Sequence, residues 1–213
     1  MFYEPRKGNH GLPHNPIKSC FVPRPIGWIS TLSDEGVANL APYSFFNAVS
    51  AAPPMLMFSS NGTGPQGGVK DSRHNCETSG EFVVNIATWD LREELNQSSF
   101  AYESSVSEMA ALGLEAAACK LVSAPRVAGC PIALECKYWK TVELPGTDGS
   151  SENAMVIGEV IGVHIDESVL TDGLIDIGKL KPIARMGYMD FAVIDSTSTF
   201  TMPRPQSPAK SGT

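Results

Sequence analysis

The sequence contains little that would build a disulfide framework or a metal site. Its five cysteines are odd in number and widely spaced, and none of them forms a C-x-x-C pair. Cysteines at such spacings support neither a set of disulfides nor a zinc site. Two of the four histidines, His10 and His14, are four residues apart, but Pro13 between them prevents a regular helix from presenting both. We therefore predict no metal-binding site.

Long apolar runs and an excess of positive charge are also absent. No segment reaches the roughly 20 apolar residues that cross a bilayer, and the start, MFYEPRKGNHGLPHNP, lacks the apolar core of a signal peptide. The chain carries 16 basic and 23 acidic residues, a net charge of −7, which opposes attraction to phosphate backbones. We expect a cytoplasmic protein with neither nucleic acid nor membrane as a partner. A small anion can still bind where local charges favour it.

No arrangement of catalytic side chains can be identified in the sequence. The G-x-S-x-G sequence of serine hydrolases does not occur. Acidic residues such as Glu135, Glu143 and Glu159 lie on predicted strands without an identifiable partner, so a pair of catalytic carboxylates has no support. His164 and Asp166 share one face of a predicted strand, which is typical of a surface pair. The lack of catalytic side chains indicates that a bound cofactor supplies the chemistry.

The composition is that of a folded protein, with 42% hydrophobic and 18% charged residues. A chain of 213 residues is long enough for one sizeable domain. Residues 1–17 are rich in proline, glycine and basic side chains and are expected to form an arm. Residues 196–213 are polar and rich in proline, so a flexible tail is expected there. The domain is therefore predicted to span residues 18–195.

Alternating apolar residues predict a mainly β protein. Residues 26–46 contain the turn SDEG with Gly36 in a positive-φ position, which predicts a hairpin. Apolar side chains occupy even positions in residues 132–144 and odd positions in residues 155–165, so both segments are expected to be long strands with one buried face. The overall expectation is an antiparallel β-barrel with short helices on its outside. Shorter strands are predicted at residues 55–60 and 81–87.

Three short helices are predicted from capping signals. The first covers residues 72–79, with Asp71 or Ser72 as its N-cap and Gly80 at its C-terminus. The second begins at Asp90, which is expected to cap it, and the third follows Ser105 or Ser107.

Residues 62–67, GTGPQG, match the G-x-G-x-x-G pattern of a dinucleotide-binding loop. The helix of that fold must pack an apolar face on a parallel sheet. Residues 64–80, however, offer only Val69 and Cys76 as apolar side chains, and no alternation of strands and helices follows. A flexible loop is favoured, and a dinucleotide-binding dehydrogenase is the alternative.

The stretch that follows this loop, GGVKDSRHN, has two interpretations. Backbone N–H groups and the positive end of the helix dipole, together with Lys70 and Arg73, could hold a phosphate. Asp71 opposes this, because a carboxylate repels a phosphate unless it is turned aside or paired with Lys70. The residues alone favour a solvated helix with a good cap.

Six stretches of the chain, taken in order, resemble the flavin reductase-like family with the FMN-binding split-barrel fold. The resemblance covers about residues 18–195. The stretches are PRPIGWIST (23–31), NLAPYSFFN (39–47), PPMLMFSS (53–60), KDSRHN (70–75), GEFVVNI (80–86) and PIARMGYMDF (182–191).

The resemblance implies a homodimer of split β-barrels with one FMN bound by each subunit. It places Lys70, Asp71 and Ser72 at the FMN phosphate, with Arg185 as a further contact. The remaining residues are expected beside the isoalloxazine ring and the ribityl chain; they are Trp28, Thr31, Asn39, Ala41, Pro42, Ser44, Ser59 and Ser60.

The chain departs from the family pattern in the glycine-rich loop at residues 61–69 and at Cys76. The resemblance implies an NAD(P)H-dependent FMN reductase that passes reduced flavin or electrons to a partner such as an oxygenase. The alternative is an FMN-binding electron carrier or flavin-storage module that NAD(P)H does not reduce directly. The loop bears on this choice because it could cover the flavin.

Overall fold

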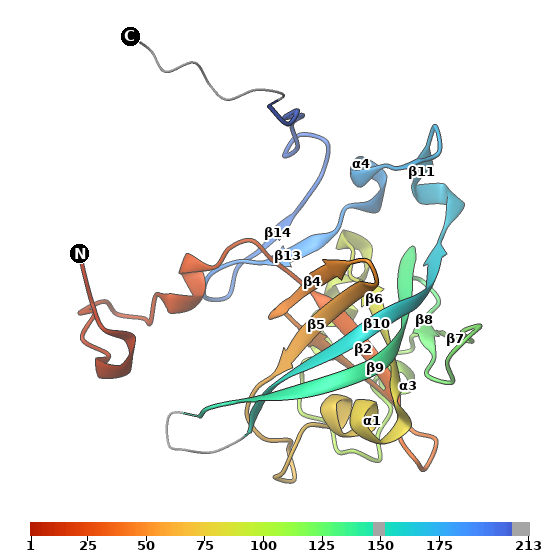
Figure 1. The fold of residues 1–213 in the computed structure, drawn as a ribbon, viewed down its shortest axis with the longest axis horizontal. Helices are drawn as coiled ribbons and strands as arrows, with labels where there is room; N and C mark the ends of the chain where they lie inside the picture. Colours follow the sequence, from red (N-terminus) through yellow and green to blue (C-terminus); the bar gives the residue numbers. More distant parts are fainter. Residues whose placement is uncertain (147–151, 206–213) are drawn as a thin grey trace.

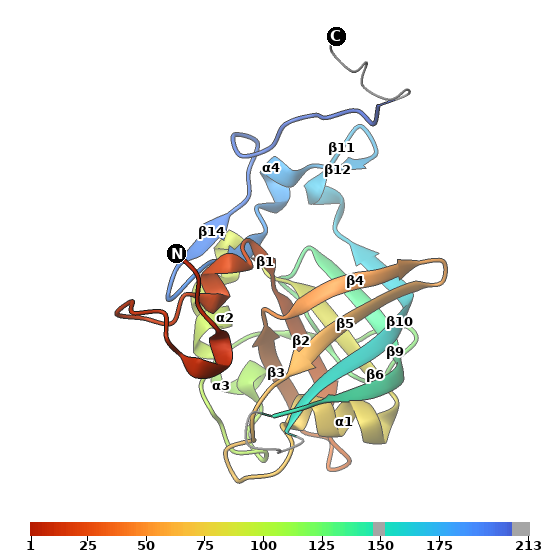
Figure 2. The same ribbon diagram turned by 60° about the vertical axis from the view of Figure 1, so that its left-hand side comes forward.

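A computed structural model describes residues 1–146 and 152–205. Its main feature is a seven-stranded sheet that curls into a split β-barrel (Figures 1 and 2). All of its strand pairs are antiparallel, as predicted. The spatial order is β3-β2-β6-β9-β10-β5-β4. The strands are β2 (Gly27–Leu32), β3 (Ala38–Tyr43), β4 (Phe46–Ala51), β5 (Pro54–Ser60), β6 (Glu81–Ile86), β9 (Ile132–Leu144) and β10 (Asn153–Ile165).

The antiparallel sheet rules out the dinucleotide-binding alternative, which needs parallel strands joined by helices. The predicted hairpin is present, since β2 pairs with β3 and Gly36 has a φ of 79° in the turn between them. The two predicted shorter strands are also present, as β5 and β6.

The two long strands differ in which face they bury. In the first part of β9 the even positions point inward, as predicted, and Leu134, Cys136 and Tyr138 join the barrel core. Beyond the register shift the odd position Thr141 lies opposite the core residue Val156, so the prediction fails there. In β10 the prediction was wrong, because Val156 and Val160 at even positions face the core. Two register shifts between β9 and β10, after Ile157 and after Val160, accompany this arrangement. Beyond the second shift the sides exchange, because Gly162 lies opposite Glu135 and Val163 lies opposite Leu134. In this part of β10 the apolar side chains of Ile161, Val163 and Ile165 are exposed.

Large aromatic side chains fill the interior of the barrel. Phe58 and Phe82 are fully buried and meet edge to face, with ring centroids 5.6 Å apart, and Tyr43 lies 4.8 Å from Phe58. Such pairs add about 0.5–1.5 kcal/mol beyond the burial of their area. Cys76 reaches the same core from the helix α1 (Asp71–Ser79). Cysteine suits this buried position, because a free cysteine behaves as a small hydrophobic residue.

Helix α1 packs across one end of the barrel (Figure 2). Its C-terminus is as predicted, since Gly80 has a φ of 73° and its N–H donates to the carbonyl of Cys76. The N-terminus differs from prediction: Lys70 is the N-cap residue and makes no side-chain capping bond. Asp71 and Ser72 lie inside the first turn, and their side chains bond to other segments.

A second layer covers the outer face of β2 and β3. It consists of η3 (Trp89–Leu91), α2 (Arg92–Gln97) and α3 (Glu108–Ala111). Trp28 is buried beneath α2 and donates from its indole nitrogen to the hydroxyl of Ser98, at 2.9 Å. Asp90 caps neither helix, and Ser107 precedes α3 without a side-chain bond, so neither predicted cap forms.

A small sheet beside the barrel joins residues far apart in the sequence. It consists of β1 (Arg24–Pro25), β13 (Ile183–Arg185) and β14 (Phe191–Val193), in that order. None of the helices in the described ranges is long and apolar enough to cross a membrane. The remaining short elements are η1 (Pro5–Lys7), η2 (Ile17–Cys20), β7 (Ala116–Ala117), β8 (Arg126–Val127), η4 (Glu167–Val169), β11 (Leu170–Thr171), β12 (Leu174–Ile175) and α4 (Ile177–Leu180).

Candidate functional site

A cavity of about 260 Å³ opens where the N-terminus of α1 meets strand β3. Its walls come from five segments: strand β3, the glycine-rich loop, the first turn of α1, the chain after α2 and the start of α3. Six of the predicted site residues line it, namely Asn39, Ala41, Pro42, Lys70, Asp71 and Ser72.

The first turn of α1 brings unused hydrogen-bond donors to this cavity. The first N–H groups of a helix have no acceptor within the helix, and they carry the positive end of its dipole. Lys70 adds a full charge, and no salt bridge to it forms within residues 1–146 and 152–205. Partial burial lowers the pKa of Lys70 from its usual value. The cavity therefore has a positive end.

The two residues after Lys70 are held by bonds across the cavity wall. The carboxylate of Asp71 accepts a hydrogen bond from the hydroxyl of Ser104, at 2.8 Å. Ser72 is buried, and its hydroxyl accepts from the amide of Asn39, at 2.9 Å. The hydrogen bond from Ser104 therefore holds the carboxylate of Asp71 and reduces its repulsion of a bound anion.

Arg73 does not contribute to the cavity. Its Nε lies 2.8 Å from Glu77 and its Nη2 lies 3.5 Å from Glu143. The expectation that Arg73 adds charge beside the helix N-terminus was therefore wrong, because these two carboxylates already pair with it.

Several residues in the cavity wall carry no motif that would identify them from the sequence. Burial raises the pKa of Tyr43 to about 12, so its phenol stays protonated at neutral pH. Glu108 is buried and accepts the N–H of Leu40, at 2.8 Å, and burial raises its pKa. The segment after α2 also lines the cavity with Ser98, Ser99, Phe100, Ala101 and Tyr102.

The glycine-rich loop forms one wall of the cavity through Thr63, Gly64 and Pro65. It folds on itself, since the N–H of Gly64 donates to the carbonyl of Gly68 and the N–H of Gly67 donates to that of Gly64, both at 3.0 Å. The loop is thus part of the site rather than an unconnected surface turn.

Three predicted residues lie inside the protein instead of lining any of the described cavities. Trp28 and Thr31 are fully buried, and the hydroxyl of Thr31 accepts from the amide of Asn75 on α1, at 3.0 Å. The hydroxyl of Ser60 is buried without a hydrogen-bond partner in the described ranges. In this structure Trp28 and Thr31 support the fold from beneath the site.

The other predicted residues line neighbouring cavities. Ser44 and Arg185 line a cavity of about 210 Å³ that shares Pro42 and Ser99 with the first one. Ser59 lines a wider one of about 570 Å³ on the other side of Ser44. Arg185 therefore does not share a cavity with Lys70 and Ser72, with which the resemblance had grouped it.

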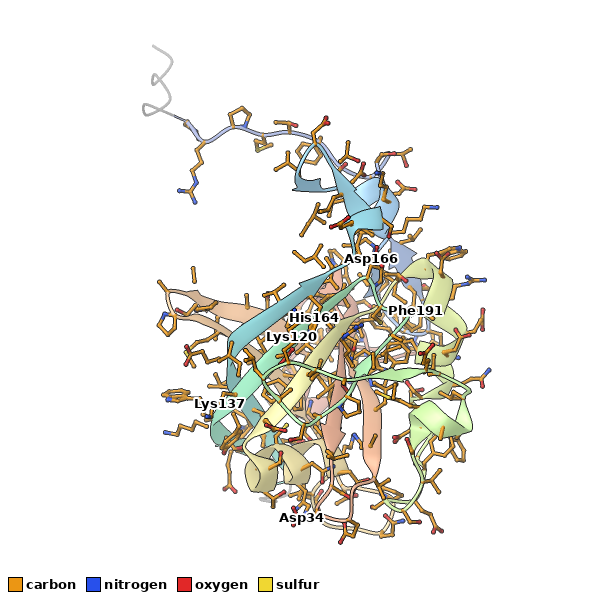
Figure 3. The ribbon with its side chains drawn as sticks, turned by 90° about the vertical axis from the view of Figure 1, so that its right-hand side faces the viewer. Asp34, Lys120, Lys137, His164, Asp166 and Phe191 are labelled. Carbon is orange, nitrogen blue, oxygen red and sulfur yellow. The ribbon has the colours of Figure 1, made fainter. Side chains whose placement is uncertain are left out.

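A second polar cluster lies on the opposite part of the barrel wall, on β9 and β10. Glu135 is buried, although the sequence offered no partner for it. Its carboxylate accepts the N–H groups of Lys120, Leu121 and Val122 at 2.8, 2.6 and 3.2 Å, and His164 donates to it at 2.5 Å. Figure 3 shows His164 and Lys120 together on this face.

Hydrogen bonding determines the direction in which the pKa of Glu135 is shifted. Burial alone would raise the pKa of Glu135, but the bonds from Lys120 and His164 outweigh it and hold the pKa below its usual value. The predicted pairing of His164 with Asp166 was wrong, since Asp166 accepts from the N–H of Ser168 instead.

Cys119 completes the only group of three metal-ligand side chains within the described ranges, with ligand atoms within 4.8 Å of one another. Both oxygens of Glu135 already accept two hydrogen bonds each. Burial, with the charge of Glu135 adding to it, raises the pKa of Cys119 to about 11, so the thiol is neutral at pH 7. We interpret the cluster as structural.

Known proteins share this architecture. The family described as "Flavin reductase like domain" matches residues 19–183. The protein YwrF of Bacillus subtilis is 33% identical over 191 residues, which cover 89% of this chain and 91% of that protein. Nitrilotriacetate monooxygenase component B from Bacillus cereus superposes with a TM-score of 0.80 at 29% identity, over 91% of this chain and 100% of that chain.

A second solved structure, the 2-nitrobenzoate 2-nitroreductase of Pseudomonas fluorescens, has a TM-score of 0.77 at 25% identity and is covered over 92% of both chains. The family match spans most of the chain, and the split-barrel fold agrees with it. The protein belongs to the flavin reductase-like family.

Proposed function

We propose that this protein binds FMN in the cavity at the N-terminus of α1 and uses it to take hydride from NAD(P)H. FMN supplies the chemistry, because it accepts a hydride and releases electrons to a partner such as an oxygenase. The observation that carries the proposal is a positively charged cavity end, where Lys70 has no salt bridge to any described residue and Asp71 is bonded to Ser104.

The chain's own residues would bind and orient the cofactor. The N–H groups of the first turn of α1 and the ammonium group of Lys70 suit a phosphate. Ser72 is fixed by Asn39, so its hydroxyl is held in place before any ligand arrives. Pro42 restricts the backbone of β3 at the cavity wall. A rigid wall of this kind lowers the entropy lost on binding.

Anaerobic mixing of the purified protein with FMN and with NADH or NADPH tests the proposal. We expect FMN to bind at micromolar concentration and its absorbance to bleach when either nicotinamide is added. Bleaching with only one of them would identify the preferred donor. An absence of FMN binding would refute the proposal.

The same experiment separates the reductase from the electron carrier. A carrier would bind FMN but would not be bleached by either nicotinamide. The loop wall formed by Thr63, Gly64 and Pro65 favours keeping this second candidate, because a covered flavin would be less accessible to a nicotinamide.

We further propose that the functional unit is a homodimer. The C-terminal half of β10 exposes three apolar side chains, Ile161, Val163 and Ile165, with Val163 57% exposed. Exposed apolar side chains that are grouped together are typical of a protein interface. We expect a dimer in analytical ultracentrifugation, weakened by Val163→Asp but not by Val106→Asp, which alters an exposed valine elsewhere. A monomer in the unaltered protein would refute this part.

A further inference from the structure

A separate cavity of about 320 Å³ lies between the segment Trp89–Asn96 and the strands β13 and β14. It shares Asn96, Arg185 and Phe191 with the 210 Å³ cavity, which in turn adjoins the proposed flavin site through Pro42 and Ser99. The three cavities therefore form a row. Lys70, Asp71 and Ser72, which are proposed to hold the phosphate, line the first cavity and not this one.

Two arginines of its wall lie over aromatic rings. The guanidinium carbon of Arg92 lies 4.1 Å from the ring centroid of Trp89, and that of Arg185 lies 4.4 Å from that of Phe191. Each also donates to a backbone carbonyl, Arg92 to Trp89 at 2.8 Å and Arg185 to Tyr188 at 2.7 Å. A guanidinium has five N–H donors, so most of them stay available for a ligand.

The charge around this cavity is mainly positive. Arg24 stands directly opposite Arg185 in the pairing of β1 with β13, and like charges in that position are destabilising. Arg24 is buried and donates to backbone carbonyls of Lys18, Phe21 and Met186, so it brings no compensating carboxylate. An anion near Arg185 would offset the repulsion.

Glu93 is the only carboxylate in the cavity wall, as far as the described ranges extend. It lies 3.5 Å from the Nε of Arg92, and its side chain is 70% exposed. An exposed ion pair of this length is weak. Glu93 therefore reduces the positive charge of the cavity without removing it.

The rest of the wall is apolar, with Ile183, Met189, Ala192 and Val193 beside the two aromatic rings. An apolar cavity of about 150 Å³ is large enough to hold benzene. The present cavity has about twice that volume, which suits a ligand of one or two rings.

We propose that this cavity binds a small planar aromatic carboxylate. The ring would pack among the apolar side chains, and the carboxylate would pair with Arg92 and Arg185, whose planar forks match a carboxylate. This site goes beyond the proposed flavin chemistry, and its occupation does not require FMN. Its position at the end of the row would leave the cavity of about 210 Å³ between the aromatic acid and the cofactor site.

Isothermal titration calorimetry of the full chain without FMN tests the proposal, with 2-naphthoate as the probe and neutral 2-naphthamide as its matched control. We expect the acid to bind at least tenfold more tightly than the amide. Arg92→Gln should weaken naphthoate binding at least tenfold, whereas Arg6→Gln, which removes a charge from an exposed position, should not. Glu93→Gln should strengthen binding two- to fivefold.

Arg185→Lys provides a second test that keeps the charge at the small sheet and removes the planar fork. We expect it to weaken naphthoate binding at least fivefold while the circular dichroism spectrum stays unchanged. Equal binding of acid and amide, or equal binding by the Arg92→Gln and Arg6→Gln variants, would overturn the proposal. Because FMN is absent from these titrations, their failure leaves the flavin proposal to its own test.

Discussion

Two polar clusters of the barrel differ in what their hydrogen-bonding groups do. On β9 and β10, both oxygens of Glu135 are occupied by three backbone N–H groups and His164. At the N-terminus of α1, Lys70 has no salt bridge within the described ranges, and the first N–H groups of the helix have no helical acceptor. The saturated cluster stabilises the fold, whereas the unsaturated one can receive a ligand.

Glu135→Gln should have the largest effect, and on stability alone. The substitution removes the charge that four donors share and presents a new donor to some of them, which should cost about 2–3 kcal/mol of unfolding free energy. Urea unfolding followed by circular dichroism measures this. Glu159→Gln, on the exposed face of the neighbouring strand, is the matched control and should change stability by less than about 0.5 kcal/mol. Comparable losses in both variants would show that Glu135 has no special role.

Lys70→Gln, in contrast, should weaken FMN binding and leave the stability unchanged. The loss of a charged hydrogen bond to phosphate costs about 1.5–3 kcal/mol, so FMN should bind about 10- to 100-fold more weakly. Unfolding free energy should stay the same, because no salt bridge is lost. Quenching of FMN fluorescence gives the affinity, and Lys137→Gln, an exposed lysine on β9 (Figure 3), serves as the control. Unchanged FMN affinity would remove Lys70 from the site.

Acid should weaken the saturated cluster selectively. The pKa of Glu135 is lowered in the folded protein, so its contribution to stability is present above the unfolded-state pKa of about 4.3. It is lost as the pH falls through the lower folded value. The unaltered protein should therefore lose more stability than Glu135→Gln between pH 5 and pH 3. Parallel stability curves for the two proteins would contradict the assigned pKa shift.

Substitutions that change the charge or the hydrogen bond of Asp71 should have the smallest effect on FMN affinity. Ser104→Ala releases the carboxylate of Asp71 from its bond, and the freed charge should weaken FMN binding two- to threefold, because two charges about 4 Å apart in water interact by about 1 kcal/mol. Asp71→Asn should strengthen binding by a similar factor. Flavin titrations of both variants provide the measurement, and changes of the same sign would exclude this role for the carboxylate.

Much of the fold could be predicted from local patterns. Short apolar runs located β5 and β6, and residue alternation located β9. Gly36 and Gly80 located a turn and a helix end. These features could be predicted because they depend on neighbouring residues alone. The buried face of β10 was predicted wrongly. Its alternation was clear, but a register shift against β9 after Val160 divides the strand, so the positions before and after the shift do not share one face.

The site was predicted through the resemblance more than through residue chemistry. Lys70 and Ser72 do meet Asn39 in one cavity wall, yet the partners Ser104 and Tyr43 gave no signal, since they come from other segments and carry no motif. Glu135 and His164 are 29 residues apart. The sequence indicated no partner for Glu135 and placed His164 beside Asp166. Only the pairing of β9 with β10 brings Glu135 and His164 together.

The sequence by itself determined the strand periodicity, the helix after Lys70 and the family, since each depends on the order of residues along the chain. The tertiary structure alone decided which polar groups are satisfied. Whether a lysine or a glutamate has a partner depends on segments that fold against it from elsewhere in the chain. That difference separates the carboxylate that stabilises the barrel wall from the ammonium group that stays available to a phosphate.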